Sequence, residues 1–251
     1  MAKTALITGA TSGIGEACAR LFAQNGCNLI LTGRRIERLD QLSEELSASG
    51  VKVLTLSFDV SNKAEVAQAL ESVTEEWKSV NYLVNNAGLS LGLEPIHEGD
   101  LNDWDTMIDT NIKGLLYVTK IVSNWMVQRK QGHIVNLGSI AGKETYADGN
   151  VYCATKHAVD SLNKAMRIDL LPYGIKVTGI HPGAVETEFS EVRFKGDTKR
   201  AKGVYQGFEP LVAEDIADTI WYCVSRPEHV NINDLIIMPS AQASTSHLRK
   251  Y

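Results

Sequence analysis

Short apolar runs alternate with longer amphipathic stretches along nearly all of the 251 residues. Several of the apolar runs are apolar on both faces, which is typical of parallel strands that helices cover on both sides. We interpret as strands residues 5–8, 28–32, 51–58, 82–85, 133–137, 176–180 and 235–238. Helical patterns lie between them at residues 13–25, 36–49, 63–77, 101–129, 150–171 and 214–225. This alternation predicts an α/β fold, a single domain over residues 1–251 with about seven strands in one doubly wound parallel sheet and helices on both faces.

One segment, residues 186–209, interrupts the alternation. It contains Gly196, Gly203 and Gly207 and many charged side chains, so it is too polar for a core. A long insertion of this kind inside a compact domain is usually a functional lid or is disordered. Because ligands of doubly wound sheets bind beyond the carboxyl ends of the strands, we expect a substrate lid at about 186–209, with disorder as the alternative.

A glycine-rich turn, residues 9–15, joins the first strand to the first helix. Glycine permits a tight turn and a close approach of phosphate oxygens to the backbone. The N-terminus of the following helix offers free N–H groups and a positive dipole to a pyrophosphate. Between a strand and a helix, this pattern predicts a Rossmann-type dinucleotide-binding site. The alternative is a tight strand–helix turn that binds no ligand. The expected contacts are Gly9, Thr11, Ser12, Gly13, Ile14 and Gly15.

The end of the second strand indicates which dinucleotide is bound. An acidic residue there would grip the adenosine ribose of NAD, but Gly33 occupies this place and Arg34 and Arg35 follow. A guanidinium binds a 2′-phosphate with charge-assisted bonds, so we predict NADP(H), and the alternative is a solvated basic cap on the next helix. Asp59 and Val60, after the third strand, are candidates for adenine contacts, with Asp59 as a helix N-cap the alternative.

Four polar positions suggest an acid–base site. Tyr152 and Lys156 are spaced i, i+4 on one helix face, and Ser139 lies thirteen residues before Tyr152, just past a strand. The run Asn85-Asn86-Ala87-Gly88 closes the fourth strand, and Asn111 lies inside a predicted helix, where asparagine is locally unfavourable. A tyrosine and lysine at this spacing could also be a surface pair. A tyrosine that works near neutral pH needs its pKa lowered from about 10, which a neighbouring ammonium and a cationic nicotinamide would both favour.

Together, these motifs and Pro182-Gly183 resemble the classical short-chain dehydrogenase/reductase family over essentially the whole chain. The resemblance implies that Tyr152 is the general acid/base and that Ser139 holds the substrate carbonyl. It implies that Lys156 lowers the pKa of Tyr152 and bonds the nicotinamide ribose, and that Asn111 supports a water chain to Lys156. It also implies cofactor contacts at Asn86, Ala87, Gly88, Tyr152, Lys156, Pro182, Gly183, Val185 and Thr187.

Longer strings resemble one subgroup, the NADP-dependent 3-hydroxy acid dehydrogenases. They include residues 33–35, 92–95, 105–111, 149–152, 188–197 and 229–233. This resemblance implies substrates such as serine, allo-threonine and 3-hydroxypropionate, with reduction of malonic semialdehyde. It also implies a homotetramer with contacts around residues 101–129 and 150–171, although packing of these helices on the sheet explains their apolar stripes equally well.

A 3-hydroxy acid carries a carboxylate near its reacting hydroxyl. Arg193 and Lys195, on the irregular segment after the nicotinamide loop, are our candidates to bind it, and the alternative is that both are solvated lid charges.

Two other functions remain open. A reductase of 3-oxoacyl chains on acyl carrier protein, or another carbonyl reductase, is the first, and a non-catalytic nucleotide-sensing protein is the second.

The charge and the cysteine content of the sequence limit which partners and which cell compartment we expect. With 25 basic and 30 acidic side chains the net charge is −5, which gives no bulk attraction for nucleic acid or anionic lipid. The four cysteines form no C-x-x-C motif and the six histidines no H-x-x-x-H motif, so we expect neither a metal site nor a disulfide framework. The first apolar run is too short for a signal sequence or a membrane span, and we expect a cytoplasmic protein.

Overall fold

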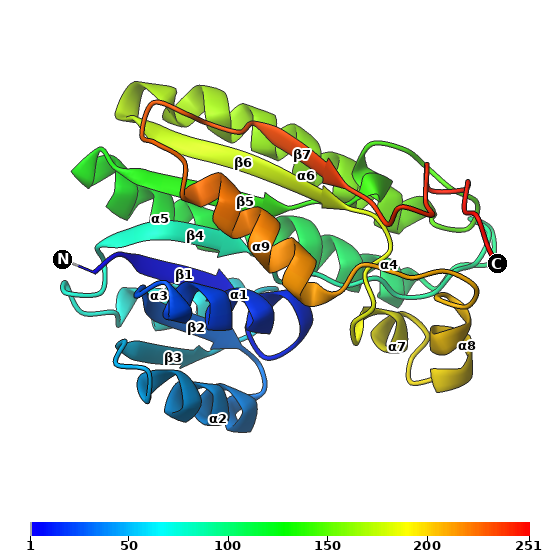
Figure 1. Ribbon diagram of the computed structural model, residues 1–251, viewed down its shortest axis with the longest axis horizontal. Coiled ribbons are helices and arrows are strands. Elements are labelled where there is room, and N and C mark those ends of the chain that lie inside the picture. Colours follow the sequence, from blue (N-terminus) through cyan, green and yellow to red (C-terminus); the bar gives the residue numbers. More distant parts are fainter. Residues whose placement is uncertain (1) are drawn as a thin grey trace.

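The computed structural model describes residues 2–251, and its centre is a sheet of seven parallel strands (Figure 1). The strand order is β3-β2-β1-β4-β5-β6-β7. From β1 the chain adds β2 and β3 on one side, then returns and adds β4 to β7 on the other side of β1. This arrangement confirms the predicted doubly wound fold. The strands are β1 (Thr4–Thr8), β2 (Asn28–Gly33), β3 (Val53–Ser57), β4 (Val80–Asn85), β5 (Gly132–Leu137), β6 (Ile175–Pro182) and β7 (Asp234–Ile237).

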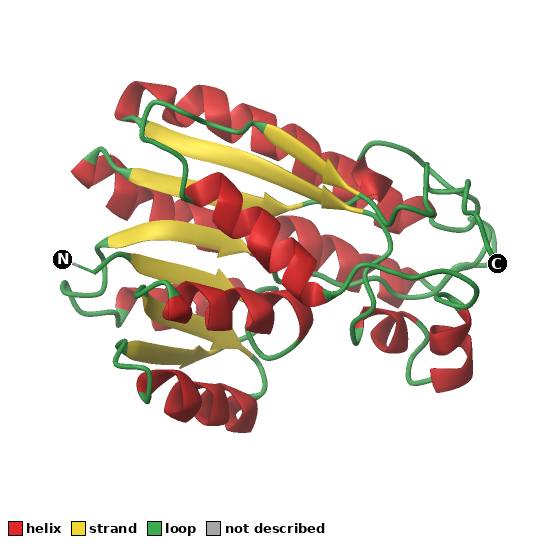
Figure 2. Cartoon of the chain, viewed as in Figure 1, coloured by secondary structure: helices red, strands yellow, loops and turns green. Residues whose placement is uncertain are grey.

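Helices cover both faces of this sheet (Figure 2). Ala5 and Ile7 of β1 point into a core that α1, α2 and α9 close, whereas Leu6 points into a second core that α3, α5 and α6 close. Because neighbouring side chains of one strand enter different cores, the three central residues of β1 are all apolar. The helices are α1 (Gly13–Gln24), α2 (Ile36–Ser47), α3 (Lys63–Glu71), α4 (Leu101–Ile108), α5 (Leu115–Arg129), α6 (Asn150–Leu170), α7 (Phe189–Arg193), α8 (Thr198–Gly203) and α9 (Ala213–Val224).

Two helices differ from the prediction. Helix α3 ends at Glu71, not at residue 77. Val73 lies beyond this end but is still buried, so the apolar pattern of the sequence extends further than the helix. The long pattern at 101–129 contains a π-helical turn at Asp109–Gly114 between α4 and α5. Such wide turns occur often at functional sites, and this one contains Asn111.

The predicted lid segment is ordered, so the alternative of disorder is wrong. It forms α7 and α8, and it buries the side chains of Ser190, Ala201 and Phe208. Figure 1 shows both helices beyond the arrowheads of the strands, at the end of the sheet where a ligand is expected. None of the helices between residues 2 and 251 combines the length and the apolar character that a membrane span requires.

Candidate active site

A cleft opens at the carboxyl ends of the strands. It lies where β1, of one half of the sheet, meets β4, of the other half. Loops after β1, β2, β3, β4, β5 and β6 all contribute to its wall, together with α6 and the start of the lid segment. Predicted site residues on the wall are Gly9, Thr11, Ser12, Gly13, Ile14, Arg34, Arg35, Asp59, Val60, Asn86, Ala87, Gly88, Ser139, Tyr152, Lys156, Pro182, Gly183, Val185 and Thr187. Gly15, Asn111, Arg193 and Lys195 are not part of this wall.

The glycine-rich turn has the conformation that its sequence predicts. Gly9 and Gly13 have φ angles of +67° and +53°, in the left-handed region that favours glycine. A Cβ atom on Gly15 would lie 2.3 Å from the Gly9 carbonyl oxygen, so Gly15 allows close packing beneath the turn. Ser12 begins α1 without a side-chain cap, which leaves the N–H groups at the start of this helix for an anionic group.

The segment after β4 holds this turn in place. The Asn86 side-chain amide donates hydrogen bonds to the carbonyl oxygens of Thr8 (2.9 Å) and Gly9 (3.2 Å). The Thr8 hydroxyl oxygen accepts hydrogen bonds from the backbone N–H groups of Asn86 and Ala87, both at 3.0 Å. Asn86 therefore braces the floor of the cleft with its side chain.

The two predicted arginines lie at the mouth of the cleft. Arg34 is mostly exposed and pairs with Asp59 at 3.4 Å. The Arg35 guanidinium donates to the Thr11 and Ser12 hydroxyl oxygens and to the Glu188 carboxylate, so it is tied to the glycine-rich turn and to the lid segment. Arg35 stands at the N-cap position of α2, but its guanidinium is bound to protein groups and not to solvent alone.

Two details at this end of the cleft differ from the sequence expectations. The Asp59 side chain accepts hydrogen bonds from the Ser61 backbone and hydroxyl, and Asn62 is the residue that caps α3, so the N-cap alternative for Asp59 is wrong. Arg38, which no motif singled out, also pairs with Glu188, at 2.7 Å.

At the other end of the cleft, α6 places Tyr152 and Lys156 side by side, and both are buried. The Lys156 ammonium donates to the Leu137 carbonyl oxygen at 2.8 Å, and burial lowers its pKa to about 8. Burial raises the pKa of Tyr152 well above its usual range, and Tyr146 acts in the same direction, while Arg193 and the Ser139 hydroxyl oppose the increase. Without a cofactor, desolvation thus outweighs the nearby cation, and the lowering of the Tyr152 pKa by Lys156 and a bound nicotinamide stays a prediction.

Asn111 lies behind the cleft wall, where its side chain connects three parts of the site. Its amide oxygen accepts from the Leu89 N–H (2.8 Å), and its amide nitrogen donates to the Leu89 carbonyl oxygen (2.8 Å) and the Thr155 hydroxyl (3.1 Å). These bonds tie the π-helical turn to the loop after β4 and to α6. The unfavourable position of an asparagine inside a helical pattern was the sequence signal for these long-range hydrogen bonds.

Arg193 and Lys195 have different surroundings. Lys195 is mostly exposed and pairs with Asp103 at 2.9 Å, away from the cleft wall. The Arg193 guanidinium lies over the rings of Tyr152 and Phe189, 5.1 and 5.2 Å from their centroids. It is therefore next to Tyr152, although it does not form part of the wall.

Ser90 and Tyr146, which the sequence interpretation missed, hold this guanidinium. Arg193 Nε donates to the Ser90 hydroxyl oxygen at 3.0 Å, and Nη2 donates to the Tyr146 hydroxyl oxygen at 2.9 Å. The only signal in the sequence is that both follow strands whose carboxyl ends line the cleft.

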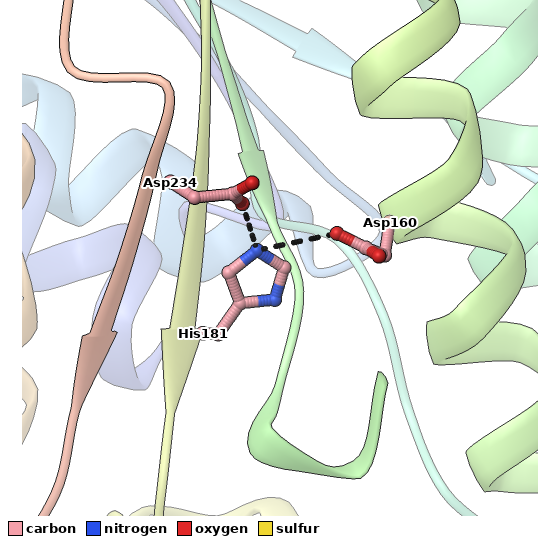
Figure 3. A group of neighbouring side chains, drawn as sticks. All are labelled: Asp160, His181 and Asp234. Atoms are coloured by element: carbon pink, nitrogen blue, oxygen red, sulfur yellow. Dashed lines mark hydrogen bonds and ion pairs between the residues drawn. The ribbon is translucent and has the colours of Figure 1, made fainter. Parts of the chain in front are cut away.

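A group of metal-ligand residue types lies away from the cleft, where Asp160, His181 and Asp234 face one another (Figure 3). His181 Nε2 is 2.7 Å from Asp234 Oδ1 and 3.8 Å from Asp160 Oδ1. The Lys143 ammonium lies 2.6 Å from Asp160 and 3.3 Å from Asp234, so a cation already balances these two carboxylates.

Comparison with known proteins decides the family. The family model described as short chain dehydrogenase matches residues 3–198. The chain belongs to the short-chain dehydrogenase family. Among members of this family, an NADP-dependent 3-hydroxy acid dehydrogenase of Salmonella typhi is 49% identical over 239 residues, which cover 95% of each chain. Sulfoacetaldehyde reductase 2 of Chromohalobacter salexigens is 47% identical over 97% of this chain and 96% of its own.

A solved short-chain dehydrogenase has nearly the same structure. The closed form of a serine dehydrogenase in complex with NADP+ superposes with a TM-score of 0.93 at 46% identity, over 99% of both chains. The similarity to this enzyme therefore includes the lid segment and the C-terminal residues as well as the sheet.

Proposed function

We propose that the chain is an NADP(H)-dependent oxidoreductase that transfers a hydride between the nicotinamide and a small 3-hydroxy acid or the corresponding oxo acid. The substrate class comprises serine, allo-threonine and the pair 3-hydroxypropionate and malonic semialdehyde. One observation carries this proposal: Ser139, Tyr152 and Lys156 meet in a single cleft, with the guanidinium of Arg193 against the tyrosine ring. The names of the two relatives described above support an oxidoreductase of this kind.

The cleft suits NADP(H) along its whole length. The start of α1 and the glycine-rich turn would hold the pyrophosphate, and Arg34 and Arg35 would hold the 2′-phosphate, since Gly33 presents no competing carboxylate. Asp59 and Val60 would contact the adenine, Lys156 the ribose and Thr187 the carboxamide of the nicotinamide. When bound, the cofactor supplies or accepts the hydride.

Tyr152 then handles the proton. During reduction the protonated phenol would act as the general acid for the carbonyl oxygen, and nearby positive charge would have to offset the burial that raises its pKa. Ser139 would hold the same oxygen. In the oxidative direction the phenolate would be stabilised by positive charge from Arg193, from Lys156 and from the oxidised nicotinamide. Asn111 would position the loop after β4 and the water chain that serves Lys156.

The anionic end of the substrate belongs beside Arg193. Malonic semialdehyde and sulfoacetaldehyde share one skeleton, in which an anionic group is attached to the carbon next to the aldehyde carbon. Two of the similar relatives carry names for substrates of this kind, and the Arg193 guanidinium lies over the Tyr152 ring, where it could bind such a group. Lys195 is the weaker candidate, because it pairs with Asp103.

A spectrophotometric comparison tests this function. Loss of NADPH absorbance should be fast with malonic semialdehyde and much slower with a 3-oxoacyl thioester, and NADH should replace NADPH poorly. Faster turnover of the thioester would favour the acyl-carrier-protein reductase, and no turnover of any carbonyl compound would favour a nucleotide-sensing protein.

The assembly and compartment complete the proposal. A cytoplasmic location is supported by the buried, unpaired state of all four cysteines, and a homotetramer by the exposed apolar side chains of Ile168 and Leu171 at the C-terminal end of α6. Residues 186–209 would act as the substrate lid, and neither a nucleic acid nor a membrane would be a partner. Light scattering of the purified protein would give the mass of the assembly.

A further inference from the structure

Arg193 is a half-buried cation without a counter-ion. Nε and Nη2 donate to hydroxyl oxygens, and no carboxylate of residues 2–251 forms an ion pair with this guanidinium. By contrast, Arg35, Arg38 and Lys195 each pair with a carboxylate. An unpaired, partly desolvated cation is costly, so it favours the arrival of an anionic ligand.

The two hydroxyl groups beside Arg193 also have spare donors. Since the Ser90 and Tyr146 oxygens accept hydrogen bonds from the guanidinium, their own hydrogens must point elsewhere. Within the described part of the chain neither hydroxyl has an acceptor, although Ser90 is only 1% exposed. Burial raises the pKa of Tyr146, which therefore keeps its proton at neutral pH. The two hydroxyl hydrogens and the remaining guanidinium N–H groups thus lie together, and the described residues offer them no acceptor.

The position of this group fits the proposed substrate. The guanidinium carbon is 5.1 Å from the centroid of the Tyr152 ring, whose hydroxyl would meet the reacting oxygen. In a 3-hydroxy acid, two bonds of about 1.5 Å each separate the hydroxyl-bearing carbon from the carboxyl carbon. The anionic group of such a substrate therefore stays close to the reacting carbon, as a guanidinium beside the Tyr152 ring requires.

We propose that Ser90, Tyr146 and Arg193 form one subsite for the anionic group of the substrate. Arg193 is the charged ligand, and Ser90 and Tyr146 are positioning residues that fix its guanidinium against the Tyr152 and Phe189 rings. The inference rests on the proposed function, and it assigns the selectivity for acids over neutral carbonyl compounds to these three side chains. A carboxylate and a sulfonate are both anions that the donors can bind.

The test compares malonic semialdehyde with 3-methylbutanal, in which an isopropyl group replaces the carboxylate. Loss of a hydrogen bond to a charged group predicts that Arg193→Met lowers the acid-to-neutral ratio of kcat/KM about ten- to a hundredfold, mainly through KM. Tyr146→Phe and Ser90→Ala should lower it by smaller factors. Lys199→Met, which removes an exposed positive charge from α8, is the matched control and should leave the ratio unchanged. Thermal unfolding checks that each variant is folded.

A double-mutant cycle shows whether Tyr146 acts through Arg193. Adding Tyr146→Phe to Arg193→Met should cost less than it does in the wild type, because the side chain that Tyr146 positions is gone. Fully independent effects would overturn the positioning role, as would Ser90→Ala and Tyr146→Phe variants that keep the wild-type ratio while Arg193→Met loses it. In that second case the proposed function stands. A wild-type enzyme that prefers the neutral aldehyde would overturn both.

Discussion

The Glu188 carboxylate lies 2.8 Å from the Arg35 guanidinium and joins the lid segment to the glycine-rich side of the cleft. Burial acts to raise the pKa of Glu188, but the hydrogen bonds and charges of Arg38 and Arg35 outweigh it and lower the pKa. Glu188 is therefore ionised at neutral pH. It forms an ion pair with Arg35, which we expect to bind the 2′-phosphate.

A Glu188→Gln variant should accordingly bind NADPH more tightly. The substitution removes a negative charge that competes with the phosphate for Arg35, and both partners are about 40% exposed, so the gain should be modest. Exposed ion pairs contribute under about 1 kcal/mol, which corresponds to about a two- to fivefold lower Kd. Titration by NADPH fluorescence measures it, with NADH as the control that should not change. Weaker binding of NADPH would show instead that Glu188 orients Arg35 for the phosphate.

The cofactor preference itself should depend on Arg35. Arg35→Ala removes a charge-assisted bond and should weaken NADPH binding by about 1.5–3 kcal/mol, roughly ten- to a hundredfold, with little effect on NADH. Introducing an acid at Gly33 is a poorer experiment, because a Cβ there would lie 2.6 Å from the Thr11 side chain. Equal losses for both dinucleotides would contradict a role for Arg35 in binding the 2′-phosphate.

Much of the site could be predicted because it depends on local sequence. The glycine-rich turn, the strand end before Ser139 and the i, i+4 pair of Tyr152 and Lys156 each lie within one strand–loop–helix unit, whose pattern the sequence displays. The parallel order of the strands follows from the same repeated unit.

The surroundings of Arg193 could not be predicted in this way. Its partners Ser90 and Tyr146 are 103 and 47 residues away in the chain, and no local pattern links these positions. The same holds for Glu188, which lies 153 residues from Arg35. Side-chain contacts between distant loops depend on how the strand ends are arranged in space, and only the folded chain shows them.

A buried histidine should make stability depend on pH. Burial, aided by the charge of Lys176, lowers the pKa of His133 to about 3, whereas an unfolded chain would bind this proton near pH 6.5. Because only the unfolded state gains a proton between these values, stability should fall as the pH decreases from 6.5 toward 3, by about 1.4 kcal/mol per pH unit from this group.

His133→Gln isolates this contribution. The His133 Nε2 atom lies 2.7 Å from the Thr178 hydroxyl, which itself donates to the Ile232 carbonyl oxygen, so Nε2 must be the donor that glutamine can replace. Urea unfolding at pH 7, 6 and 5, at one protein concentration, should show a shallower loss of stability in the variant than in the wild type. Parallel pH profiles would mean that His133 titrates with the same pKa in the folded and the unfolded protein.

The most direct test of the proposed reaction is the rate of the Tyr152→Phe variant with NADPH and malonic semialdehyde. The phenol is the proposed proton donor, and general acid–base catalysis contributes about 10²–10⁴ in rate, so kcat should fall by that factor. NADPH affinity, measured by fluorescence on the same sample, should remain unchanged, because the hydroxyl acts on the substrate. A variant that binds NADPH normally and keeps more than about a tenth of the wild-type kcat would contradict the assignment of Tyr152 as the general acid.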